Sequence, residues 1–130
     1  MYSLVRPFFP NSLPQVAALK TIEIMEREDV LDNIRKKGNQ FAKKVNEIIE
    51  ESGVPCTFSG GAYMPYITFN SDTNHLYRKL REEFYRQLIR RGIFLQPYHH
   101  GYICYRHTED DLDNAANMVD ESLKECKKLM

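Results

Sequence analysis

Four side chains that lie close together in the sequence have the right types for metal binding or catalysis: His99, His100, Cys104 and His107. Imidazole and thiolate groups bind zinc, and a cysteine activated by a histidine can act as a nucleophile. Their spacing matches no standard ligand motif, and Cys104 and His107 would point to opposite faces of an extended segment. We therefore interpret the histidines as loop residues and Cys104 as a small side chain buried in an apolar strand. No metal site is predicted.

The elements around these residues are predicted from two short apolar runs, Ile93 to Leu95 and Tyr102 to Tyr105. The runs flank a break at Pro97 to Gly101, which is typical of strand, loop and strand. Thr108 then precedes a helix expected from Glu109 toward Leu129. The first turn of this helix is acidic and its last turn is basic, as the helix dipole favours. The acidic residues therefore have a structural cause and are not interpreted as a metal site.

Three helices are expected upstream of this stretch. The first begins at Ser12, which has the spacing of a capping box with Gln15. It is apolar on nearly every side through Met25, a pattern typical of a helix that other protein covers on several sides. The second helix is amphipathic and runs from Asp29 to a C-terminal cap at Gly53. The third begins at Asp72 or Thr73 and ends at Gly92.

Between the second and third helices, the pattern changes from helical to alternating, which predicts two strands joined by a turn at Gly60 and Gly61. Ala62 to Phe69 is the longest strand candidate, and Pro65 within it indicates a sheet edge or a bulge. The predicted order is therefore ααββαββα. This order favours an α+β fold with a small, mostly antiparallel sheet of three to four strands and helices packed on one face.

Composition limits the classes of function. The 130 residues include 42% hydrophobic residues, which suits one compact domain, and 18 basic residues balance 18 acidic ones. The third helix has a basic outer face, but Glu82 and Glu83 dilute it and no aromatic side chains alternate with the basic ones, so no nucleic-acid partner is expected. Three irregularly spaced cysteines, no secretory leader and no long apolar run favour a cytoplasmic protein with no membrane segment.

The order and spacing of residues 10–34, 59–70, 90–97 and 100–115 resemble the C-terminal part of class III pyridoxal-phosphate-dependent aminotransferases. The branch that they resemble is that of glutamate-1-semialdehyde 2,1-aminomutase. The resemblance implies a small α+β domain of a fold-type I enzyme, here residues 12–130, preceded by an extended lead-in at residues 1–11. It also implies that the first helix links this domain to a large domain and contacts a second subunit, and that it self-associates when the chain is isolated.

The resemblance also implies how such a domain contributes to catalysis. The family's lysine for pyridoxal phosphate belongs to the large domain, and no segment here resembles its surroundings. The chain alone is therefore expected to bind no cofactor, to hold no catalytic residue and to be inactive. The threonine that touches the cofactor phosphate in the family corresponds to Pro7. His99 and His100 are expected on a loop at the substrate rim, and His99 stands where the aminomutase branch has an acidic residue.

Two hypotheses about function follow. The first is a separated C-terminal domain of a class III aminotransferase or aminomutase, which supplies substrate-side and dimer contacts. The alternative is a stand-alone α+β module for binding or regulation without catalysis. The apolar first helix, together with Phe8 and Phe9, favours the first hypothesis, because a self-sufficient module should have a polar surface there. The sequence leaves the substrate open, and also the choice between aminotransferase and aminomutase.

Overall fold

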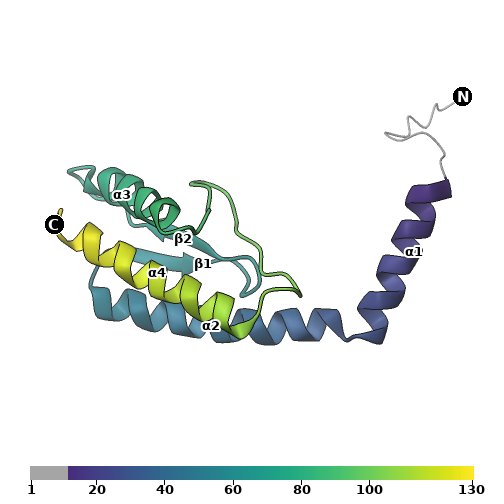
Figure 1. Cartoon of the computed structure of the whole chain (residues 1–130). Coiled ribbons are helices and arrows are strands. Elements are labelled where there is room, and N and C mark those ends of the chain that lie inside the picture. Colours follow the sequence, from purple (N-terminus) through teal and green to yellow (C-terminus); the bar gives the residue numbers. More distant parts are fainter. Residues whose placement is uncertain (1–11) are drawn as a thin grey trace, which may run out of the picture. The chain divides into compact units, whose positions relative to one another are not determined.

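The computed structural model describes residues 12–130 (Figure 1). Residues 1–11, with the expected lead-in, Pro7, Phe8 and Phe9, lie outside the described part. The elements are α1 (Ser12–Arg27), α2 (Val30–Ser52), β1 (Cys56–Ser59), β2 (Tyr66–Phe69), α3 (Leu76–Arg90) and α4 (Glu109–Lys127). The chain separates into two compact units, Met1–Asp32 and Asn33–Met130. A single domain over residues 12–130 stays a prediction.

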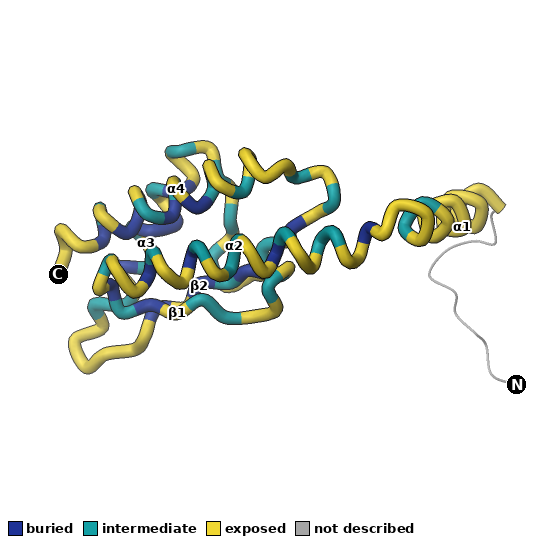
Figure 2. The backbone as a smooth tube through the Cα atoms, turned by 90° about the horizontal axis from the view of Figure 1, so that it is seen from below, coloured by how far each residue is buried: buried dark blue, intermediate teal, exposed yellow. Residues whose placement is uncertain are grey.

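The first unit contains α1, whose sequence predicted a helix covered on several sides. The helix forms, but none of its residues is buried, and Figure 2 shows it exposed along almost its whole length. Leu13 and Leu19 are 71% and 69% exposed, and Val16 and Ile22 are exposed as well. Such large apolar side chains on one helix are unusual at a protein surface in contact with water. The described residues therefore do not supply the cover that the pattern of α1 predicts.

The second unit has its own hydrophobic core, in which α3 lies along α4 and contacts β2 (Figure 1). The core includes side chains from α2, both strands, α3 and α4: Val45, Ile49, Cys56, Ile67, Phe69, Leu80, Phe84, Leu88, Ala116, Val119, Leu123 and Cys126. The Tyr85 hydroxyl donates a hydrogen bond of 3.2 Å to the backbone carbonyl of Ile67 and so joins α3 to β2. Burial raises the pKa of the Cys56 and Cys126 thiols and of the Tyr85 phenol to about 12. These groups are therefore uncharged parts of the core.

The sheet has two antiparallel strands, in which Cys56 pairs with Phe69 and Ser59 pairs with Tyr66. The prediction of an α+β fold is confirmed, whereas that of three to four strands in the order ααββαββα is only partly confirmed. In the described structure, residues 93–95 and 102–105 run as loop. The Gly101 and Ile103 amides do donate to the carbonyls of Pro65 and Tyr63, at 2.8 and 3.0 Å. Pro65 has no N–H to return a bond, so a regular ladder cannot form at this point.

Gly38 lets α2 approach the turn that precedes β2. A Cβ at this buried glycine would lie 2.9 Å from backbone atoms of Ala62 and Tyr63. This close contact places the backbone of Ala62 and Tyr63 against α2. The carbonyls of Tyr63 and Pro65 accept the hydrogen bonds of the loop described below.

None of the helices among residues 12–130 is long and apolar enough to span a membrane.

Candidate functional site

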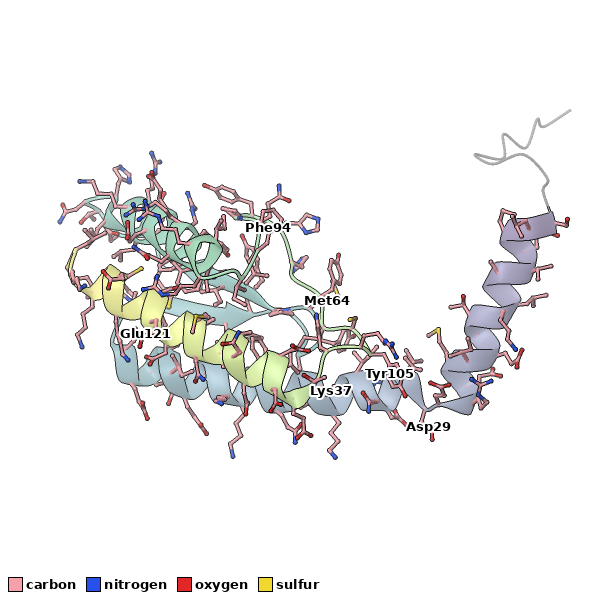
Figure 3. The ribbon with its side chains drawn as sticks, in the orientation of Figure 1. Asp29, Lys37, Met64, Phe94, Tyr105 and Glu121 are labelled. Atoms are coloured by element: carbon pink, nitrogen blue, oxygen red, sulfur yellow. The ribbon has the colours of Figure 1, made fainter. Side chains whose placement is uncertain are left out.

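A hollow of about 680 Å³ lies between the α3–α4 loop (residues 91–108) and the first turns of α4. Its lining is mostly apolar with a few polar groups, which is typical of ligand pockets. The lining residues are Phe41, Pro65, Gly92, Ile93, Phe94, Leu95, Gln96, His99, His100, Gly101, Tyr102, Ile103, His107, Asp111, Leu112, Asn114 and Ala115. Phe94, on the loop just after α3 (Figure 3), is 78% exposed. The hollow therefore has an exposed aromatic side chain at its edge.

The α3–α4 loop is held on two sides. On one side, its Gly101 and Ile103 amides donate to the carbonyls of Pro65 and Tyr63, as described above. A Cβ at Gly101 would lie 2.8 Å from a methyl group of Leu95, so a side chain here would require Leu95 to shift. On the other side, the Lys37 ammonium on α2 donates to the carbonyls of Tyr105 and His107, at 3.0 and 2.7 Å. Figure 3 shows Lys37 beside Tyr105. The loop is thus positioned by the segment just before β2 and by α2 together.

The end of the loop is fixed by a capping box at the start of α4. The Thr108 side chain accepts a hydrogen bond of 3.1 Å from the Asp111 amide, and the Asp111 carboxylate accepts one of 2.8 Å from the Thr108 amide. The hydrogen bond from the Thr108 amide first, and then the Thr108 side chain, hold the pKa of the Asp111 carboxyl below its ordinary value. The interpretation of the acidic residues as the first turn of a helix is confirmed.

The structure brings His99 and His100 together on the hollow. Both are exposed, and the His99 Nδ1 lies 2.9 Å from the His100 carbonyl oxygen. The His100 ring packs edge-on against Tyr66, with 5.4 Å between ring centres. The ring nitrogens of imidazole side chains in this position can form hydrogen bonds with a molecule in the hollow.

Cys104 and His107 lie near one another but do not form a nucleophile and base pair. The His107 Nδ1 accepts its hydrogen bond, of 3.2 Å, from the backbone amide of Cys104 rather than from the thiol. The prediction that Cys104 is buried in a strand is wrong, since it lies exposed in a loop. The sheet of the described residues consists of β1 and β2 only, so no strand packs beside the segment of Cys104 and its side chain stays exposed. No group of three or more His, Cys, Asp or Glu side chains within residues 12–130 could hold a metal ion.

A cluster of arginine and tyrosine side chains beside the hollow was not expected from the sequence. The Arg81 guanidinium lies 4.2 Å from the centre of the Tyr98 ring, and the Arg78 and Arg81 guanidinium groups both lie within 6 Å of the Tyr77 ring centre. The prediction that no aromatic residues alternate with the basic ones on this face is therefore wrong. Tyr77 and Arg81 do stand at helical spacing, a signal that sequence analysis could have used, whereas Tyr98 reaches the face from the loop.

No protein-family model matches the chain. It is, however, 56% identical over 123 residues to the 3-aminobutyryl-CoA aminotransferase of Cloacimonas acidaminovorans (strain Evry), a match that covers 95% of this chain and 30% of that protein. The chain belongs to the class III pyridoxal-phosphate enzymes. It is also 32% identical over 114 residues to glutamate-1-semialdehyde 2,1-aminomutase of Desulfovibrio desulfuricans, over 81% of this chain and 27% of that protein. The predicted family is confirmed.

A solved structure shows the same fold. The FumI protein of Sphingopyxis sp. MTA144, in its PLP internal aldimine form, has a TM-score of 0.76 with this chain at 21% identity. The match covers 92% of this chain and 30% of the other one. The chain thus spans less than a third of the length of its relatives, which is the extent of one domain of a class III enzyme.

The residues that line the hollow do not fit pyridoxal phosphate. Their side chains include no lysine for the aldehyde and no lysine or arginine for the phosphate, and Asp111 would repel the phosphate. The nearby Lys37 already donates to two carbonyls. The hollow therefore lacks the side chains that would hold this cofactor.

Proposed function

We propose that the chain is the C-terminal domain of a class III aminotransferase that acts on an aminoacyl thioester of coenzyme A. The observation that carries this proposal is the 56% identity, over 95% of the chain, to a 3-aminobutyryl-CoA aminotransferase, against 32% to an aminomutase. This difference favours an aminotransferase over an aminomutase. The proposed setting is the cytoplasm.

In this proposal, the domain supplies contacts and no catalytic lysine. The pyridoxal phosphate and its lysine belong to the large domain, since the residues lining the hollow do not fit the cofactor. His99 and His100 form part of the substrate rim, which their exposure on the hollow supports. The exposed apolar face of α1 contacts the large domain and a second subunit, which the exposure of Leu13 and Leu19 supports.

A chimaeric enzyme tests this function. The segment of the Cloacimonas enzyme that matches this chain is replaced by the chain, and the product is assayed with 3-aminobutyryl-CoA. We expect activity within about tenfold of the parent enzyme. Such a decrease corresponds to a loss of at most about 1.4 kcal/mol of transition-state stabilisation. A chimaera that carries the Desulfovibrio aminomutase segment instead is the control and should lose more activity. A chimaera with this chain that folds and binds pyridoxal phosphate but is inactive would contradict the proposal.

The same chimaera tests the rim residues. His99→Ala and His100→Ala are expected to lower kcat/KM for the thioester while leaving the cofactor absorbance unchanged, because both side chains line the hollow.

In a separate measurement, the purified chain is mixed with pyridoxal phosphate near neutral pH. We expect no aldimine absorbance band, and a band that depends on a lysine of this chain would show that it holds the cofactor itself.

A further inference from the structure

The arginine and tyrosine cluster beside the hollow has the composition of a nucleotide site. It consists of Tyr77, Arg78 and Arg81 on α3 and Tyr98 on the α3–α4 loop, and we call it the Arg–Tyr cluster. One face of the Tyr98 ring is covered by the Arg81 guanidinium at 4.2 Å, yet the residue is 67% exposed. The ring therefore offers a second, open face on which a planar group can stack.

The backbone of Tyr98 supports a role for this exposed ring. Its φ is 66°, in the left-handed region that a tyrosine seldom adopts. Backbone strain of this kind gathers at ligand-binding sites, where the surrounding structure maintains it. Here the contact with Arg81 and the fixed path of the loop toward Gly101 maintain it. The result is an aromatic ring held outward next to two cations.

The charges of the cluster are not used within the described part of the chain. Arg78 donates a hydrogen bond of 3.1 Å to the Tyr77 hydroxyl, and neither it nor Arg81 forms an ion pair with a carboxylate of residues 12–130. By contrast, Arg86 on the same helix is paired with Glu83. The Tyr77 bond, and to a smaller extent Tyr98, raises the pKa of Arg78. Two guanidinium groups with free N–H donors are well suited to bind phosphate groups.

We propose that the Arg–Tyr cluster binds the nucleotide end of a coenzyme A thioester. The guanidinium groups of Arg78 and Arg81 bind its phosphates, and its adenine stacks on the open face of Tyr98. The proposal deepens the proposed function and rests on its aminoacyl-CoA substrate. It also explains the position of the cluster, because Tyr98 directly precedes His99 on the hollow, so the acyl arm of the same molecule can lead past the histidines.

Binding to the purified chain tests the site directly. Isothermal titration uses coenzyme A, adenosine 3′,5′-bisphosphate and pantetheine as separate probes. We expect heat of binding with the first two and none with pantetheine, because the recognised groups are the phosphates and the adenine. Inorganic pyrophosphate should compete more weakly than coenzyme A, because it lacks the stacking group. The absence of binding by coenzyme A, or equal competition by pyrophosphate, would overturn the proposal.

Two variants and one control locate the site. Arg81→Gln removes the charge, and Tyr98→Asn removes the ring while keeping a residue that tolerates the left-handed backbone. Each is expected to weaken coenzyme A binding about tenfold or more, as the loss of one stacking or charge-assisted contact does. Arg90→Gln removes a charge from the same helix outside the cluster and should change the affinity less than about twofold. Circular dichroism verifies that each variant is folded, and unchanged affinity in both folded variants would overturn the proposal.

Steady-state kinetics of the chimaera separate this proposal from the proposed function. Arg81→Gln in the chimaera should raise KM for 3-aminobutyryl-CoA about tenfold and leave kcat nearly unchanged, since the cluster would bind a part of the substrate that does not react. An active chimaera whose KM does not respond to Arg81→Gln would overturn the cluster proposal and leave the function intact. An inactive chimaera, together with cluster-dependent binding of coenzyme A, would overturn the function and leave the nucleotide site intact.

Discussion

Among single residues, Gly38 shows how one missing side chain positions the site. Glycine within a helix costs about 1 kcal/mol relative to alanine, but a Cβ here would lie 2.9 Å from the backbone of Ala62 and Tyr63. We expect Gly38→Ala to lower the free energy of unfolding by about 1 to 3 kcal/mol, because the turn must move. Urea unfolding followed by circular dichroism measures this. Asn39→Ala, at the exposed neighbour on α2, is the control and should be neutral or stabilising.

Asp72 gives a prediction about pH. Its carboxylate accepts hydrogen bonds from the amides of Asn74, Leu76 and Tyr77 at 2.8 to 3.0 Å. These bonds, that from Tyr77 first, hold its pKa below the ordinary value. A carboxyl whose pKa is lower in the folded state stabilises the fold fully above its unfolded pKa, which is about 3.9, and loses this contribution progressively as the pH falls from there through the lower folded pKa.

Asp72→Asn keeps one acceptor oxygen and removes the charge. We therefore expect the variant to unfold at a lower urea concentration than the natural chain at about pH 7, and the difference to shrink at about pH 3. Asp113→Asn, at an exposed carboxylate that pairs with Lys44 across the surface, is a matched control for the loss of charge. A difference between Asp72→Asn and the natural chain that stays constant over this range would show that the charge of Asp72 does not stabilise α3.

At the scale of elements, the sequence predicts helices more reliably than strands in this chain. The start of α4 is set by Thr108 and Asp111, which lie three residues apart, so its cause is visible locally. Whether the segment at residues 102–105 becomes a strand depends on Pro65, almost forty residues away in the sequence, whose carbonyl accepts a hydrogen bond but which has no N–H to return one. The same limit explains why Gly38 and the contact between Arg81 and Tyr98 were missed. Each has its partner on a distant segment.

The exposed face of α1 gives the prediction for an element. Leu19→Glu should reduce self-association of the isolated chain, because it places a charge on an apolar face that we propose to be an interface. Sedimentation equilibrium over a range of concentrations measures the association. At a protein concentration low enough for both chains to be monomeric, the urea midpoint should not change, since Leu19 is not buried. Gln15→Glu adds the same charge at an exposed polar position and serves as the control. A natural chain that is monomeric at every concentration would contradict the predicted self-association.

At the scale of the whole molecule, the chain combines one unit that has a core with one whose helix α1 has no buried residue. The family, the α+β class and the helix boundaries near Gly53 and Thr108 follow from the sequence, since they depend on motifs and local signals. The hollow and the Arg–Tyr cluster do not, because they form where the α3–α4 loop folds back on α3 and α4. The matches cover only about 30% of the length of the longer relatives. The surfaces that this chain leaves exposed are therefore the ones that need an explanation.

Hydrogen exchange can test this division between the two units. Amide protection increases with burial and cooperative packing, and α1 has no buried residues whereas Leu123 and Val119 of α4 are almost fully buried. We expect the α1 amides of the Leu19→Glu chain, in which self-association is weakened, to exchange far faster than those of α4. In the active chimaera with the natural Leu19, α1 should become protected, because the proposed partner surface then covers it. Equal protection of α1 and α4 in the isolated variant would show that α1 needs no partner, and unchanged exchange in the chimaera would remove α1 from the proposed interface.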